Sequence, residues 1–163
     1  ERLKLHGVPF QKWGQGRKGV ELEVFEVRDH KFAPKSYEGR QRLDLTGDWR
    51  AAKVDLPANT LFVPIQNPQA PLSLQLLEPL APDSLAAWGH LNAYMEQKEG
   101  IESYVIESFA QEKLKDPAVQ QAFEAYRKDP ANADAPDKLI QFFHKMHPSW
   151  DQNYRRLPIY RLN

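Results

Sequence analysis

Residues 20–27 read Val-Glu-Leu-Glu-Val-Phe-Glu-Val, and this stretch decides how the chain folds. Apolar residues alternate with glutamates from Val20 to Val24, which is the period of two of a half-buried β-strand. The alternation then shifts, because Phe25 and Val27 fall on the opposite face. Two explanations are open: a β-bulge at this point, or a strand that is buried on both faces.

Strand-like patterns continue on the C-terminal side of this stretch as far as residue 66. Leu43 and Leu45 alternate with polar residues, Thr46-Gly47-Asp48 predicts a turn, and residues 49–56 resume the extended pattern. A short apolar run follows at residues 61–65. These segments predict an antiparallel sheet or a small sandwich over residues 20–66.

The periodicity becomes helical after residue 67. Residues 68–78 fit a strand or a helix, and the start signal Asn67-Pro68 favours the helix. Further helices are predicted from Asp83 or Ser84 to Met95, from Ile101 to Leu114 with a wide and well-buried apolar face, from Pro117 after its cap Asp116, and from Pro136 to His147. Residues 129–136 are predicted to be a linker.

The segregation of strand and helix patterns along the chain predicts an α+β fold. We expect an N-terminal antiparallel β-sheet or small sandwich, at about residues 20–66, packed against a C-terminal layer of about four to five helices. Residues 1–19 are predicted to be a lead-in from an upstream domain, and residues 20–163 a single α+β domain. The aromatic and apolar tail, residues 150–162, is expected to dock onto the body.

Composition excludes several classes of protein. The 163 residues include 22 basic and 22 acidic side chains, and neither half of the chain is strongly basic, which argues against a nucleic-acid partner. No apolar run is long enough to span a membrane, so no membrane partner is expected. The absence of cysteine excludes disulfides, thiolate metal sites and a cysteine nucleophile.

A glycine motif, Gly14-Gln-Gly16-Arg-Lys-Gly19, matches the spacing of a dinucleotide-binding loop. In a dinucleotide-binding fold these glycines follow a strand and open a helix, whose N-terminus holds the pyrophosphate. Here the motif precedes a strand pattern, and no helix pattern follows it. We therefore interpret it as a loop without a cofactor.

His144 and His147 lie three residues apart near the end of a predicted helix. This spacing places both imidazoles on one side, where they could share a metal ion with Asp137 or Asp151 as further ligands. We favour a simpler interpretation, because histidines in a last helical turn interact favourably with the negative end of the helix. Zinc analysis of the purified protein distinguishes the two.

Two further side-chain groups have a chemical and a simpler interpretation. Glu96, Glu99 and Glu102 could pair carboxylates for acid–base work, but they surround a helix junction and are interpreted as a solvated face. Among the four tryptophans, Trp13 is expected to be the most exposed and could stack on a sugar, whereas Trp88 is expected in the core.

No complete catalytic motif is present. A zinc-type His-x-x-Glu would need a glutamate three residues after a histidine, and the residues at those places are Pro9, Ala33, Ala93, His147 and Trp150. His-Glu-x-x-His and Gly-x-Ser-x-Gly are also absent. We therefore predict no catalytic, cofactor-binding or metal-ligating residue, although a long-range Ser/His/Asp site stays open.

Several segments, taken in order, resemble one family. They are Phe62-Val-Pro-Ile-Gln-Asn-Pro68, Leu76-Leu-Glu-Pro79, Pro82-Asp-Ser84, Trp88-Gly89, Glu96-Gln-Lys-Glu99, Tyr104-Val105, Glu107, Ala110, His147-Pro-Ser-Trp-Asp151, Tyr154 and Pro158-Ile-Tyr-Arg161. Their order and spacing resemble the region after the catalytic domain in bacterial zinc carboxypeptidase-like peptidases of the carboxypeptidase A superfamily. The resemblance covers residues 60–163 well and residues 1–60 loosely.

Two positions depart from the family's pattern. His90-Leu91 stands where aromatic residues are expected, and Gly100 stands where a tyrosine is expected. At the other end, Leu5-His-Gly-Val8 looks like the junction at which the catalytic domain finishes. These departures affect the expected local packing rather than the assignment.

The resemblance implies a function for the parent protein. The parent would be a bacterial metallopeptidase, exported to the periplasm or secreted, whose upstream domain holds zinc and performs the proteolysis. This segment would be a non-catalytic accessory domain that stabilises or gates that peptidase domain in cis, without a cofactor of its own. The alternatives are an independent peptide- or glycan-binding module and an unrecognised hydrolase.

Overall fold

The computed structural model describes residues 1–97 and 100–162, and it divides the chain into two compact units. The first, called here the sheet unit, comprises Glu1–Glu96 and Asn153–Asn163. The second, the helical unit, comprises Gln97–Gln152. Helices and antiparallel strands are both present, so the predicted α+β class is confirmed. The prediction of a single domain stays a prediction.

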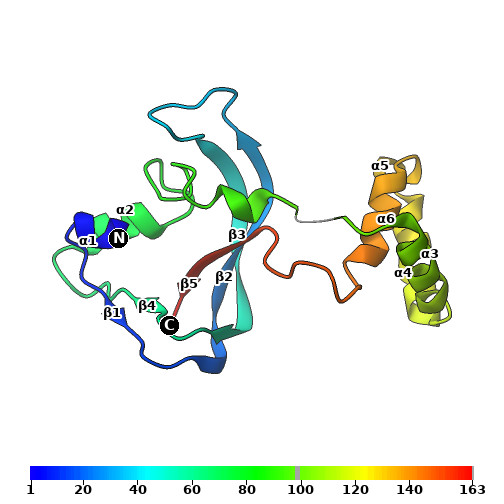
Figure 1. Cartoon of the computed structure of the whole chain (residues 1–163), viewed down its shortest axis with the longest axis horizontal. Coiled ribbons are helices and arrows are strands. Elements are labelled where there is room, and N and C mark those ends of the chain that lie inside the picture. Colours follow the sequence, from blue (N-terminus) through cyan, green and yellow to red (C-terminus); the bar gives the residue numbers. More distant parts are fainter. Residues whose placement is uncertain (98–99, 163) are drawn as a thin grey trace. The chain divides into compact units, whose positions relative to one another are not determined.

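The sheet unit contains two antiparallel sheets (Figure 1). Its elements are α1 (Arg2–Leu5), β1 (Gln11–Lys12), β2 (Arg17–Phe32), β3 (Leu43–Leu56), β4 (Leu61–Phe62), α2 (Ala70–Leu77), the 3-10 helix η1 (Asn92–Met95) and β5 (Arg156–Arg161). The larger sheet has the strand order β3-β2-β5, and the smaller one pairs β1 with β4. The predicted helix over residues 68–78 is confirmed as α2.

Strand β2 is buried on both faces, so this explanation of the shifted alternation is confirmed. Leu22 and Val24 pack in one apolar cluster with Leu56, whereas Phe25 and Val27 pack in another around Leu43 and Leu157. Pairing with β3 runs without interruption through Val24 and Phe25. On the β5 side of β2 the register shifts between Val24 and Glu26, which is a bulge or another irregularity at the place where a bulge was the alternative. Strand β2 therefore contributes side chains to two apolar cores, one on each of its faces.

The tail of the chain forms β5 and completes this sheet, so its expected docking is confirmed. β5 pairs antiparallel with β2, and it contributes Leu157 to one core and Tyr160 to the other. A backbone hydrogen bond from the N–H of Arg155 to the carbonyl of Tyr94, 2.8 Å long, joins the two places at which the chain leaves the sheet unit and returns to it. The helical unit is thus inserted between η1 and β5.

Gly47 lies within β3, so the predicted turn at residues 46–48 is wrong. A Cβ at this position would be 2.2 Å from the carbonyl oxygen of Glu26 and 2.7 Å from Cε1 of Phe25. The register also shifts here, because Val27 faces Gly47 and Asp29 faces Thr46. Gly47 is therefore required by the close approach of β2 and the Phe25 ring, rather than by a change of chain direction.

We expect Gly47→Ala to destabilise the sheet unit by about 2 kcal/mol or more, because the added methyl group displaces both backbone and the Phe25 ring. Urea denaturation followed by tryptophan fluorescence measures this loss. Gly14→Ala is the matched control, since a Cβ at Gly14 meets nothing within 4 Å. Equal losses in the two variants would contradict this account of Gly47.

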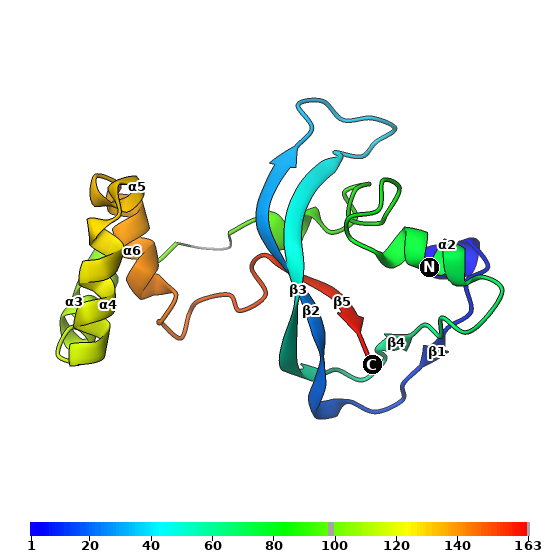
Figure 2. The same ribbon diagram turned by 180° about the vertical axis from the view of Figure 1, so that it is seen from behind.

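Helices α1 and α2 lie side by side in both views of the sheet unit (Figure 1, Figure 2). Leu3 and Val8 pack against Leu76 in a third apolar cluster, with Val63 and Leu72 at its margin. The lead-in at the start of the chain is therefore fixed onto α2. Gly7, with φ +67°, provides the bend between Leu3 and Val8.

The predicted helix from Asp83 or Ser84 to Met95 is wrong, and the chain makes successive turns before η1. The buried hydroxyl of Ser84 donates to the carbonyl of Pro79 and accepts from the N–H of Ala87. The carbonyl of Ala87 accepts from the N–H of Leu43 at the start of β3. Gly89, at φ +71°, ends any helical run. Hydrogen bonds to other elements therefore replace those of a regular helix.

The helical unit consists of α3 (Ser103–Lys113), α4 (Pro117–Lys128), α5 (Pro130–Ala133) and α6 (Pro136–His144). The Asp116 cap is confirmed, because its carboxylate accepts from the N–H of Ala118. The predicted linker at residues 129–136 is wrong: Asp129 caps α5 through the N–H of Ala131, which repeats the Asp-Pro signal of α4. No helix in the described residues is long and apolar enough to cross a membrane.

Burial in the helical unit is lower than the sequence predicts. Ile106 is the buried residue of α3, whereas Val105, Phe109 and Leu114 are half-buried. On α6 the buried residues are Phe143 and His144. The wide apolar face of α3 is therefore only partly covered by the rest of this unit, and the prediction that this helix is well buried is wrong.

Candidate functional site

The side chains of His144 and His147 meet at one hydroxyl group. His144 is the last residue of α6, and the turn after it is held by hydrogen bonds from the N–H of His147 to the carbonyl of His144 and from the N–H of Trp150 to the carbonyl of His147. This turn places Ser149 Oγ 2.8 Å from His147 Nδ1 and 3.3 Å from His144 Nε2. We call these three residues the Ser149 cluster.

The two imidazoles of the Ser149 cluster have different surroundings. His144 is 4% exposed, and its ring stands edge-on to Trp150 with 5.1 Å between ring centroids. His147 is half-buried and stands edge-on to Phe109 at 4.8 Å. Burial lowers the pKa of His144, and the nearby charge of His147 lowers it further. His144 is therefore held in its neutral form by the fold.

Sequence reasoning identified the two histidines but missed Ser149. The available signal was the segment His147-Pro-Ser149, because a residue two positions beyond a helix-end histidine can fold back onto it. Within the described residues, the structure finds no group of three or more His, Cys, Asp or Glu side chains arranged to hold a metal ion. The favoured interpretation, helix-end histidines without a metal ion, stays a prediction.

The buried His144 makes the helical unit sensitive to acid. Because its pKa is lowered in the folded state, the unfolded chain binds more protons below the ordinary histidine pKa. We expect full stability above about pH 6.5 and a progressive loss as the pH falls below it. Thermal melts followed by circular dichroism at the helical band, between about pH 8 and about pH 5, measure this loss.

Two variants separate this effect from general acid sensitivity. His144→Gln removes the titrating group and should flatten the pH dependence of the helical melt. His6→Gln changes an exposed histidine of the sheet unit and should leave that dependence as it is. A helical melt that keeps its full pH dependence in His144→Gln would show that other groups are responsible.

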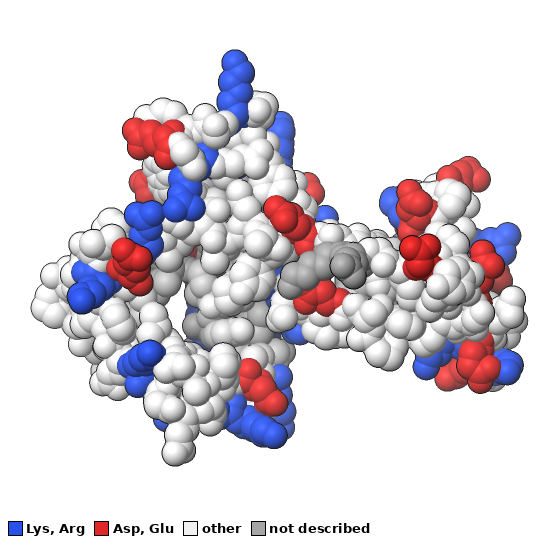
Figure 3. Space-filling view, viewed as in Figure 1, with Lys and Arg blue, Asp and Glu red and all other residues white. Residues whose placement is uncertain are grey.

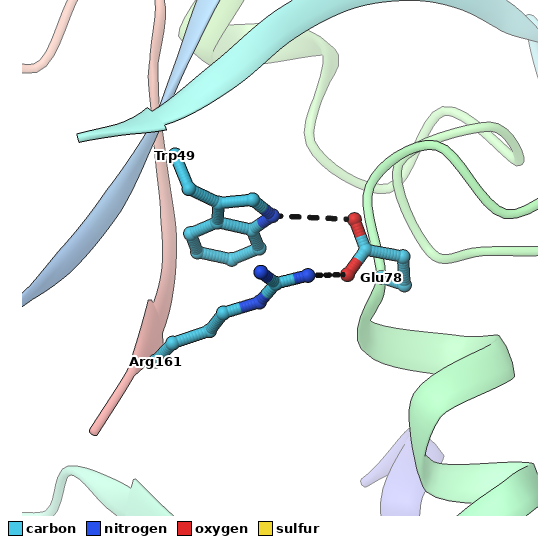
Figure 4. A network of polar contacts seen from close by, with 3 residues as sticks. All are labelled: Trp49, Glu78 and Arg161. Atoms are coloured by element: carbon cyan, nitrogen blue, oxygen red, sulfur yellow. Dashed lines mark hydrogen bonds and ion pairs between the residues drawn. The ribbon is translucent and has the colours of Figure 1, made fainter. Parts of the chain in front are cut away.

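A second polar constellation lies in the sheet unit, where Glu78 joins two strands (Figure 4). One carboxylate oxygen of Glu78 accepts from Trp49 Nε1 at 3.4 Å, and the other pairs with Arg161 at 2.5 Å. The Arg161 guanidinium also lies 4.1 Å from the centre of the Trp49 ring. Because Glu78 caps the end of α2, this clasp links α2 to β3 and β5.

The Glu78 clasp is a structural device rather than a reactive one. Arginine over an indole ring is a favourable cation–π arrangement, and the shared carboxylate fixes both groups at once. Neither Glu78 nor Arg161 was singled out from the sequence as one of a pair, because they are separated by 83 positions along the chain. No local pattern could have predicted this contact.

We expect Glu78→Gln to lower the free energy of unfolding of the sheet unit by about 0.5–1 kcal/mol, because it removes the ion pair while keeping an acceptor for Trp49. Urea denaturation measures the loss. Glu21→Gln is the control, since Glu21 pairs with Lys53 at 3.2 Å and both side chains are more than 70% exposed. A loss no larger than that of the control would contradict the role of the clasp.

Trp13 is half-buried, as are the other three tryptophans, so the expectation that it is the most exposed of the four stays a prediction. The Arg17 guanidinium lies 3.7 Å from the centre of the Trp13 ring, and Phe62 stacks on it with an interplanar angle of 16°. Trp13 is half-buried and packs beside the core that contains Leu22. Its ring is therefore occupied by side chains of the sheet unit, which removes the basis for a sugar platform at this tryptophan.

Trp88 is likewise engaged, although only partly buried. Arg42 lies 4.7 Å from the centre of its ring, and its Nε1 donates to Asp83 at 3.2 Å. Trp13, Trp49 and Trp88 thus each carry an arginine over the ring. These three tryptophans therefore take part in intramolecular contacts.

The glycine motif leads into a strand, as predicted, because β2 begins at Arg17. A Cβ at Gly16 would be 3.0 Å from the carbonyl oxygen of Leu56, so this glycine permits the close approach of the strand that follows. The N–H of Gly19 donates to the carboxylate of Asp55 at 2.8 Å. A carboxylate at this place repels a phosphate, which agrees with the interpretation as a loop without a cofactor.

The three glutamates of the predicted acidic group do not all lie in one unit. Glu96 follows η1 in the sheet unit, and Glu102 caps α3 in the helical unit. Glu99 lies outside the described residues. The interpretation of the three glutamates as a solvated face stays a prediction.

Comparison with known proteins returned no match: no protein-family model, no curated protein and no solved structure is similar to this chain. The resemblance given by the ordered segments of the sequence therefore stays a prediction.

Proposed function

We propose that this chain is a non-catalytic accessory domain of a bacterial zinc carboxypeptidase-like peptidase, and that it stabilises or gates an upstream catalytic domain in cis. The parent would be exported, and its zinc would lie in the upstream domain. The observation that carries the proposal is the ordered set of segments between Phe62 and Arg161 that resembles the region following such a domain.

The positions of these segments in the fold support a shared architecture. Leu76-Leu-Glu-Pro79 and Pro158-Ile-Tyr-Arg161 lie far apart in sequence, yet Glu78 and Arg161 form the clasp between α2 and β5. Ser84, from a third segment, is buried and organises the turns before η1. The residues that carry the resemblance therefore stabilise the fold, which is what a common accessory domain requires.

The sheet unit also offers an apolar surface for a neighbouring domain. Large hydrophobic side chains are exposed near the α1–α2 cluster, and they are Leu5 (68% exposed), Ile65 (59%), Leu80 (53%) and Leu74 (50%). Basic and acidic side chains are interspersed over the face seen in Figure 3. Because the lead-in is fixed onto α2 through Leu3 and Val8, a domain attached through it is held close to this surface.

The coding sequence upstream of Glu1 tests the proposal directly. A zinc peptidase domain with its His-x-x-Glu pair is expected there, in the same reading frame. A different domain in that position would overturn the assignment.

Surface variants of the complete polypeptide then test the mode of action. We expect the double variant Leu5→Ser, Leu74→Ser to lower the melting temperature of the peptidase activity by about 3 °C, because an interdomain contact is lost. The same substitutions should leave the melt of the isolated chain almost unchanged, since both side chains are exposed.

Tyr104→Ser is the matched control, because Tyr104 is a 72% exposed aromatic residue of the helical unit. If the Tyr104 variant lowers the melting temperature as much as the double variant does, the α1–α2 surface has no special role. If neither lowers it, stabilisation through this surface is excluded even where an upstream peptidase is present.

A further inference from the structure

The Ser149 cluster has a defined direction of hydrogen bonding. The backbone N–H of Ser149 donates to His147 Nδ1 at 3.1 Å, so this nitrogen carries its lone pair rather than a proton. Ser149 Oγ lies 2.8 Å from the same nitrogen, so its proton shares the one lone pair of Nδ1 with the backbone N–H. His144 Nε2, 3.3 Å from Oγ, then acts as a donor to the hydroxyl oxygen.

This arrangement resembles a nucleophile–base pair, with Ser149 as the nucleophile and His147 as the base. A serine hydroxyl is a weak nucleophile unless a base within hydrogen-bond reach takes its proton as the new bond forms. The unprotonated Nδ1 of His147 occupies that place. The edge contact with Phe109 holds the His147 ring in position, and the contact with Trp150 does the same for His144.

The exposure of Ser149 and the burial of His144 agree with this role. Ser149 is exposed, so a reagent can reach its oxygen. His144 is buried, and the direction of its pKa shift keeps it neutral, so it orients the hydroxyl without placing a positive charge beside His147. A neutral donor on one side and a base on the other fix the hydroxyl proton on the path toward Nδ1.

Ser73, Ser84 and Ser108 have no such base as their hydrogen-bond partner. The hydroxyls of Ser73, Ser84 and Ser108 donate to backbone carbonyl oxygens, which do not take up protons near neutral pH. Ser108 is exposed and lies in the same helical unit, where it bonds the carbonyl of Tyr104 at 3.1 Å. Ser108 is therefore an internal reference for an unassisted serine.

We propose that Ser149 is a nucleophilic serine that accepts an acyl group from carboxylic esters, with His147 as its general base. The Oγ atom forms a bond to the ester carbonyl carbon, and the carbon–oxygen bond to the leaving alcohol breaks. The Oγ proton passes to His147 Nδ1 and from there to the departing oxygen. The products are an acylated Ser149 and one alcohol or phenol.

Acetylation by p-nitrophenyl acetate tests the proposal on the whole chain. Peptide mapping by mass spectrometry should find Ser149 acetylated at least ~10-fold faster than Ser108. His147→Gln should bring the Ser149 rate down to that of Ser108, whereas Ser108→Ala should leave it unchanged. Equal labelling of the two serines, or a Ser149 rate that His147→Gln does not alter, would overturn the proposal.

The pH profile gives a second readout that needs no substitution. With an imidazole base, the labelling rate of Ser149 rises with pH and then reaches a plateau. An unassisted hydroxyl instead reacts in proportion to hydroxide, without a plateau. If circular dichroism shows that His147→Gln disrupts the helical unit, this profile in the unaltered chain decides, and a rate that rises without a plateau overturns the proposal.

Discussion

The two-sided burial of β2 is the constraint on which the sheet unit depends. Val24 and Phe25 are neighbours in sequence, yet they point into different cores, so the strand must be covered on both faces. Phe25 can be buried only because Gly47 on the facing strand has no side chain. β3 and β5 then supply both cores from either side of β2. A change in the register of β2 would remove apolar residues from both cores together.

Local signals predicted the elements that depend on local interactions. The alternation around Val24, the start signal before α2 and the Asp116 cap each correspond to an element in the structure. The predictions failed where distant segments supply the partners. Residues 83–91 have a helical pattern, but the N–H of Leu85 bonds α2, the carbonyl of Ala87 bonds the start of β3, and the remaining bonds form turns. The glycine at position 47 suggested a turn because its real reason, the Phe25 ring, lies on another strand.

The candidate sites show the same division between local and distant information. His144 and His147 were predictable from their spacing, and Ser149 was within reach of the same reasoning, because all three lie in six consecutive residues. The clasp of Trp49, Glu78 and Arg161 was not, since it joins three separate regions of the chain. Contacts between distant segments also place Arg161 over Trp49 and Arg42 over Trp88.

The insertion of the helical unit between η1 and β5 sets the order in which the chain can fold during synthesis. β2 and β3 leave the ribosome long before β5, and the whole helical unit is made in between. During that interval the hairpin has an unpaired edge along β2, and both cores lack the side chains of β5. Such an edge is a place for pairing with other nascent chains. The nascent protein is therefore most vulnerable to aggregation while the helical unit is being translated.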